Sequence, residues 1–137
     1  LDGLAHAVYT ERLEASVRFL KINGRPSELM PMFDVFVMPS LQEGFGLSVM
    51  EAQACGVPVV ASRVGGLIEA VKDGETGILV PPRDHLALAD ALISVLADKN
   101  LASRLGLAGR EWIVKNFSMD DMIRQTLAVY ADVLGQK

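Results

Sequence analysis

Residues 34–61 decide the fold, and they read DVFVMPSLQEGFGLSVMEAQACGVPVVA. The runs at 34–38 and 57–61 are short and apolar, and Pro, Ser or Gly bounds them, which predicts two buried strands. Residues 47–55 between them have the pattern of a helix. A strand, a helix and a second strand in this order are typical of a parallel α/β sheet with right-handed crossovers.

The same alternation extends on both sides of this stretch. We expect further strands at 17–20 and 77–80, and helical segments at 28–32 and 67–72. An amphipathic helix with one buried face is expected at 4–15, where the apolar positions are Leu4, Val8 and Leu13.

The C-terminal third is expected to be helical. Pro81 and Pro82 stop the last strand, and Asp84 is placed to cap a helix. Residues 101–116 form either one helix or a pair broken near Gly106 and Gly109, and Ser118 with Asp121 resembles a capping box that starts the last helix. The residues expected to be buried in this part are Leu88, Leu92, Ile93 and Leu96, then Ile123, Leu127, Tyr130 and Leu134, with Trp112 and Tyr130 as core anchors.

Composition narrows the class of protein. A chain of 137 residues with 50% hydrophobic and 22% charged residues is the size of one folded domain, and no apolar run approaches a membrane span. The 13 basic and 17 acidic residues give a net charge of −4 without long blocks of one sign, which argues against a nucleic-acid partner. The single cysteine, Cys55, and the absence of a signal peptide pattern favour a cytoplasmic location.

The loop at 39–46 carries the candidate chemistry. Ligands of an open parallel sheet bind at the carboxyl ends of its strands, where this loop is expected. Gly44 and Gly46 leave room for backbone amides at the start of the next helix to face an anion such as a diphosphate. Glu43 and Glu51 are expected to converge on the same ligand, since a carboxylate accepts hydrogen bonds from two neighbouring hydroxyls of a sugar.

Taken singly, these residues also fit a structural role. A Glu in an early helical turn is often only a partner of the helix dipole, and Gly-x-Gly is often only a turn. A dinucleotide-binding oxidoreductase is disfavoured, because Val49 stands where the Gly-x-Gly-x-x-Gly pattern needs glycine. His6 and His85 lie away from the expected strand ends and are not expected to be catalytic.

The combination of motifs resembles the donor-sugar half of family 4 glycosyltransferases, which are retaining enzymes of the GT-B fold. Two glutamates with seven residues between them, Glu43 and Glu51, enclose Gly-Phe-Gly-Leu and lie between the two strand motifs quoted above. The resemblance runs over nearly the whole chain and includes VRFL at 17–20, GGLIE at 65–69 and GETGILVPP at 74–82. It implies a Rossmann-like parallel sheet with flanking helices, the C-terminal domain of a GT-B protein.

The resemblance also implies roles for site residues. Glu43 would contact hydroxyls of the transferred sugar as the catalytic-site carboxylate, and not attack as a nucleophile. The amides around Gly44, Phe45, Gly46 and Leu47 would hold sugar and diphosphate, and Glu51 would bind the ribose hydroxyls. Lys21 and Ile22 lie where the base packs in the family, although the family commonly has glycine at the position of Lys21. The donor, a nucleoside-diphosphate sugar, is a substrate, and neither a cofactor nor a metal is expected.

The resemblance makes residues 1–137 a partial domain. The acceptor domain of a GT-B enzyme and two strands of the donor domain have no counterpart here, and Leu1 starts inside an amphipathic pattern, so we expect a piece of a longer protein. The isolated chain is expected to lack transferase activity, to expose strand edges that favour self-association, and to reach the cytoplasmic face of a membrane only through absent regions. The alternative function is a non-catalytic binding or assembly fragment of a GT-B protein.

Overall fold

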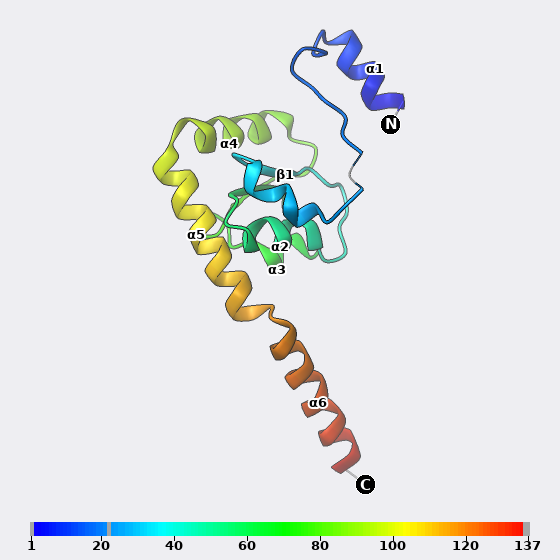
Figure 1. Cartoon of the computed structure of the whole chain (residues 1–137), viewed down its shortest axis with the longest axis vertical. Helices are drawn as coiled ribbons and strands as arrows, with labels where there is room; N and C mark the ends of the chain where they lie inside the picture. The colour runs from blue at the N-terminus through cyan, green and yellow to red at the C-terminus, as the bar shows by residue number, and fades with distance from the viewer. Residues whose placement is uncertain (1, 22, 136–137) are drawn as a thin grey trace.

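The computed structural model describes residues 2–21 and 23–135 and contains a parallel sheet. The strands β1 (Phe36–Met38), β2 (Val59–Ser62) and β3 (Ile78–Val80) lie in the order β1-β2-β3 (Figure 1). Val37 pairs with Val60, and Ala61 pairs with Leu79. The prediction of an α/β fold with a parallel sheet is confirmed, and three of the four expected strands are present.

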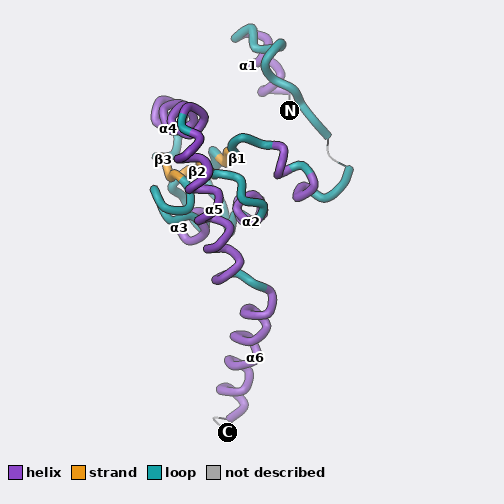
Figure 2. Tube along the Cα trace, turned by 60° about the vertical axis from the view of Figure 1, so that its left-hand side comes forward, coloured by secondary structure: helices purple, strands orange, loops and turns teal. Residues whose placement is uncertain are grey.

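Helices cover both faces of this sheet, as Figure 2 shows around the orange strands. On one face, Val59 and Ala61 of β2 pack with α2 (Leu47–Ala54) and α3 (Leu67–Ala70). On the other face, Val60 packs with α4 (His85–Ala97) and with Leu105 of α5 (Lys99–Asn116). All four residues of β2 are buried, because a central parallel strand has an apolar layer on each side.

Helix α5 is continuous from Lys99 to Asn116, so the two glycines within it do not break it. They allow close packing instead. A Cβ at Gly106 would lie 2.2 Å from the carbonyl oxygen of Gly56, and one at Gly109 would lie 3.1 Å from that of Thr76. Of the two arrangements open from the sequence, the structure has the single helix, pressed against the end of α2.

The N-terminal quarter differs from the prediction. Helix α1 (Asp2–Thr10) forms but ends earlier than expected, and its predicted buried face is wrong, since Leu4 is 66% exposed. Residues 17–20 are not a strand, because no described strand lies beside them to pair with their backbone. The segment runs clear of the sheet (Figure 1) and reaches it through two short 3-10 helices, η1 (Pro26–Glu28) and η2 (Met30–Met32).

Both predicted helix caps in the C-terminal part are confirmed. The Asp84 carboxylate accepts a hydrogen bond from the Ala87 amide at 2.9 Å, and Ser118 Oγ accepts one from the Asp121 amide at 3.1 Å. The predicted stripe of α4 is half right, because Ala91 and Val95 are buried, Leu88 and Leu92 are partly buried, and Ile93 and Leu96 are exposed. The stripe follows the sheet side of the helix, which the sequence alone does not place.

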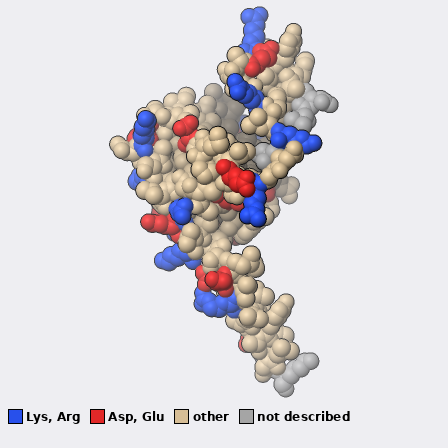
Figure 3. Space-filling model, in the orientation of Figure 1, with Lys and Arg blue, Asp and Glu red and all other residues tan. Residues whose placement is uncertain are grey.

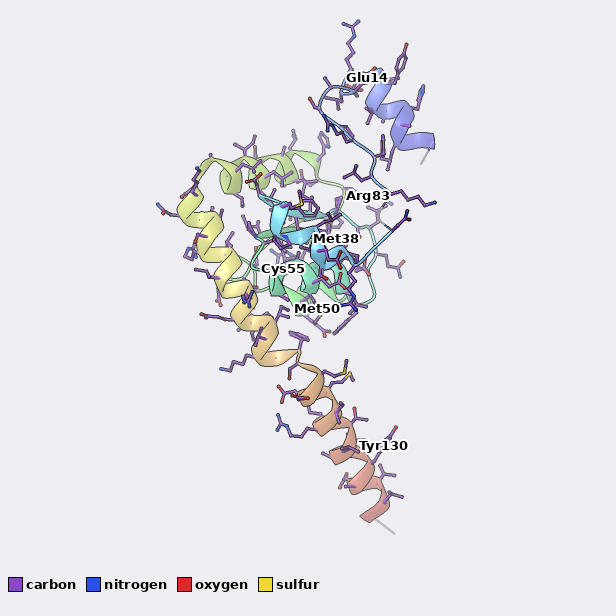
Figure 4. All side chains as sticks on the ribbon, viewed as in Figure 1. Glu14, Met38, Met50, Cys55, Arg83 and Tyr130 are labelled. Carbon is purple, nitrogen blue, oxygen red and sulfur yellow. The ribbon has the colours of Figure 1, made fainter. Side chains whose placement is uncertain are left out.

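The last helix, α6 (Met119–Gly135), extends away from the domain and has no buried residue among those described. Its predicted stripe of Ile123, Leu127, Tyr130 and Leu134 is exposed throughout. The prediction of Tyr130, labelled in Figure 4, as a core anchor is therefore wrong, whereas Trp112 is partly buried and packs against the core. None of the helices that the structure describes is long and apolar enough to span a bilayer.

Candidate functional site

A pocket of about 260 Å³ opens where β1 ends and α2 begins. Its wall consists of Met38, Glu43, Phe45, Gly46, Leu47 and Ser48. Met38 is the last residue of β1, and Leu47 is the first residue of α2. The pocket therefore lies at the carboxyl end of a parallel strand, the edge at which we expected a ligand.

Gly46 shapes this pocket as the N-cap of α2. It has the left-handed conformation, with φ 74°, and a Cβ there would lie 2.4 Å from Leu67 Cδ2. Glycine has no side chain to bond the first helical amides. The amides of Leu47 and Ser48 have no acceptor within the described chain, while the Val49 amide donates to the Gly46 carbonyl at 2.9 Å. Two free amides at a helix N-terminus favour an anion in this pocket.

A second pair of glycines, Gly65 and Gly66, contacts the backbone of the pocket loop. The Gly66 amide donates to the Glu43 carbonyl at 3.2 Å. A Cβ on Gly65 would lie 2.0 Å from that same oxygen, and one on Gly66 would lie 2.4 Å from the Gly44 oxygen. From the sequence, this pair was recognised only as part of the family resemblance, and its contact with the loop backbone was not predicted. Adjacent glycines a few residues after the predicted strand at 57–61 were the available signal.

Glu43 carries the one formal charge among the described residues that line the pocket. The side chain is partly buried, and Ser40 Oγ lies 3.5 Å from Oε2 as a long hydrogen-bond donor. Ser40, Met38 and Ser48 were not predicted as site residues. A carboxylate beside free amides presents acceptors and donors together, which suits a ligand that carries both hydroxyls and an anionic group.

The structure brings together only some of the predicted site residues. Glu43, Phe45, Gly46 and Leu47 share one pocket wall, whereas Gly44 and Glu51 are exposed outside it. Lys21 is also exposed and lies in the segment before η1, and Ile22 lies outside the described residues. The roles assigned to these residues from the resemblance stay predictions.

Charges elsewhere on the surface are mixed, as the interspersed colours of Figure 3 show on the visible face. Arg63 forms a salt bridge with Asp73 and does not line the pocket. Partial burial raises the pKa of Asp73, but the hydrogen bond from the Leu79 amide at 2.9 Å and the neighbouring Arg63 outweigh it and hold the pKa below its ordinary value. No group of three His, Cys, Asp or Glu residues suited to a metal occurs in the described chain.

The family model and the relatives that match this chain agree on one family. The family model described as "Glycosyl transferases group 1" matches residues 2–112. A D-inositol 3-phosphate glycosyltransferase of Corynebacterium diphtheriae is 45% identical over 133 residues, which cover 95% of this chain and 29% of that protein. The chain spans about a third of the length of the curated relatives it matches.

Solved structures show the same fold. The Anabaena protein HepE in complex with UDP superposes with a TM-score of 0.92 and 26% identity, over 96% of this chain and 36% of that one. The C-terminal domain of a glycosyl transferase group 1 family protein from Francisella tularensis superposes with a TM-score of 0.75 and 26% identity, over 86% of this chain and 62% of that one. The Rossmann-like fold of a C-terminal GT-B domain is thereby confirmed for the part that this chain spans.

Proposed function

Because the chain belongs to the glycosyl transferases group 1 family, we propose that it binds a nucleoside-diphosphate sugar as the donor half of a glycosyltransferase. The single observation that carries this proposal is the pocket in which Glu43 lies beside two unpaired amides at the glycine-capped start of α2. The complexes of Anabaena HepE with UDP and with UDP-glucose support it, since that protein has the same fold.

In this proposal each part of the donor meets a different group. The amides of Leu47 and Ser48 bind the diphosphate, because a helix N-terminus favours negative charge. Glu43 accepts hydrogen bonds from hydroxyls of the sugar. Glu51, four residues into α2 and exposed, binds the ribose hydroxyls at the mouth of the site.

The reaction we propose transfers the sugar with retention and without a metal. The bond from the anomeric carbon to the diphosphate oxygen breaks, and a bond to the acceptor hydroxyl oxygen forms on the same face, without an enzyme nucleophile. The proton of the acceptor hydroxyl passes to the departing diphosphate oxygen. The departing diphosphate gains negative charge, so its stabilisation is the main catalytic requirement. The described pocket wall supplies amides but no cation, so we assign the missing positive charge and the acceptor site to parts of the enzyme outside this chain, and we propose a cytoplasmic location for that enzyme.

The second candidate function is a non-catalytic binding or assembly fragment. The observation in its favour is the exposed apolar surface of α1 and α6, on which Tyr9, Leu127 and Leu134 are each at least 60% exposed. Apolar surface of this extent is typical of a site of association. This candidate predicts no nucleotide binding by the chain.

Calorimetric titration of the chain with UDP, UDP-glucose, GDP-mannose and ADP-glucose distinguishes the donor-binding function from the assembly fragment. For whichever donor binds, Glu43→Gln should weaken the sugar nucleotide about tenfold or more and leave the free nucleoside diphosphate unchanged, since a hydrogen bond to a charged group is lost. Glu51→Ala should weaken both. Glu111→Gln, an exposed carboxylate on α5, is the matched control and should change neither.

Two outcomes count against the donor site. If no nucleotide or sugar nucleotide binds the wild-type chain, the assembly candidate is favoured. If a donor binds but Glu43→Gln and Glu51→Ala leave its affinity unchanged, the pocket at the start of α2 is not where it binds.

A further inference from the structure

A row of aromatic rings connects the pocket loop to the corner between α5 and α6. The rings of Phe45 and Phe117 meet edge to face, with centroids 6.1 Å apart and planes at 65°. Those of Phe117 and Trp112 do the same at 5.9 Å and 73°. Such pairs contribute stabilisation beyond the burial of their surface. Among the described residues, Phe45 is the only member of this row that also lines the pocket, so its ring links the pocket loop to the corner.

Phe117 is held firmly at this corner. It follows the last residue of α5, and its amide donates to the Ile113 carbonyl at 2.9 Å. The next residue, Ser118, caps α6. On its other side Trp112 is fixed in α5, with Lys72 Nζ 3.9 Å from the ring centroid. With helices starting and ending beside it, Phe117 has little freedom to move its ring.

Phe45, by contrast, has little other support. It lies between Gly44 and Gly46 and is 44% exposed. With Leu47 it forms the partition between the pocket of about 260 Å³ and a second, mostly apolar hollow of about 420 Å³, which Phe117 also lines. The backbone of the loop rests on Gly65 and Gly66, but its outer side contacts the corner.

We propose that Phe117 is a positioning residue for the loop Glu43–Gly46: its ring fixes Phe45 and thereby holds the Glu43 carboxylate and the Leu47 amide in the geometry that binds the donor. The proposal rests on the proposed function for its ligand and on the aromatic contacts for its mechanism. Glycines on both sides of Phe45 make the loop intrinsically flexible, so an external contact that limits its motion pre-organises the site.

The test uses Phe117→Leu, which keeps an apolar side chain but removes the ring. Hydrogen exchange of the amides at 43–49 should become about threefold to tenfold faster, as expected for loss of the Phe45–Phe117 pair, and exchange in β2 should not change. Affinity for the donor nucleotide should fall by a similar factor. Phe117→Tyr, which restores the ring, should recover both values. Tyr130→Leu on the exposed face of α6 is the matched control and should alter neither.

The outcomes separate this proposal from the function on which it rests. Faster loop exchange in a protein that binds no nucleotide supports the positioning role and contradicts the donor site. Donor binding by the wild type, with loop exchange and affinity unchanged in Phe117→Leu, overturns the positioning role. Faster exchange throughout β2 also overturns it, because Phe117 would then support the whole core. If Phe117→Leu does not fold, Phe45→Leu removes the same ring contact from the exposed side, and the same exchange pattern decides.

Discussion

The body of the domain and its two terminal helices have similar amphipathic sequences but different surroundings. Residues of β2, α3 and α5 such as Val60, Leu67 and Leu105 are fully buried between the sheet and its helices. Leucines of α1 and α6 such as Leu4 and Leu127 lie in solvent. An apolar stripe thus predicts a helix with one apolar face. Burial of that face requires a second element for it to contact.

Removing one leucine from each region is the most direct test of this difference in burial. Leu105→Ala should lower the free energy of unfolding by about 2–5 kcal/mol, because it leaves a cavity between α5 and the sheet. Leu127→Ala on α6 should change it by less than about 0.5 kcal/mol, because its side chain is already exposed. Denaturant unfolding measures both. Equal losses would show that α6 packs as firmly as α5.

One glycine-to-alanine substitution in the domain body and one in a terminal helix test the same difference in packing. Alanine usually favours a helix over glycine. At Gly106, however, its Cβ would meet the Gly56 carbonyl, and we expect a loss of about 1–3 kcal/mol.

Gly3 of α1 provides the control for that substitution. Nothing lies within 4 Å of a Cβ there, so Gly3→Ala should stay within about 0.5 kcal/mol of wild type in the same unfolding measurement. A stabilised Gly106→Ala protein would contradict the close approach of α5 to the end of α2.

The smallest expected effect concerns pH. The folded-state pKa of Asp73 is lowered, so its contribution to stability is present above the ordinary value of 3.8 and is lost as the pH falls through the lower folded pKa. Asp73→Asn should therefore cost up to about 1 kcal/mol at pH 7, since the pair with Arg63 is two-fifths exposed. The difference from wild type should shrink below about pH 3.8. Unfolding curves across pH 2–7 measure it, and a constant difference would contradict the assigned shift.

The sequence predicted strands at 34–38, 57–61 and 77–80 in a parallel sheet, because each run is apolar on both faces and glycine or proline bounds it. The prediction from sequence covered these strands and their parallel sheet, and the order β1-β2-β3 comes from the structure. The sequence also predicted the caps at Asp84 and Ser118, which depend on local hydrogen bonds. It was wrong for 17–20, whose apolar composition is that of a strand, because a strand forms only beside another strand. Periodicity has no information about the partner.

The same holds for the candidate site, where local features were predicted from the sequence and contacts between distant segments were not. The loop at the end of β1 was predicted from its glycines and its place in the alternation, and Glu43, Phe45, Gly46 and Leu47 do share a pocket. The contact of Phe45 with Phe117 was missed, because the two residues are distant in sequence. Contacts between distant segments need the tertiary structure.

The register of the sheet has a consequence for how the chain folds. Phe36 pairs with Val59, and Val60 pairs with Ile78, so each parallel pairing joins positions about 20 residues apart. Closing loops of this size costs little more entropy than closing shorter ones, and contacts that are near in sequence speed folding. Neighbours in the sheet are also neighbours in the chain. The sheet can therefore grow one strand at a time, in the order in which the ribosome releases the strands.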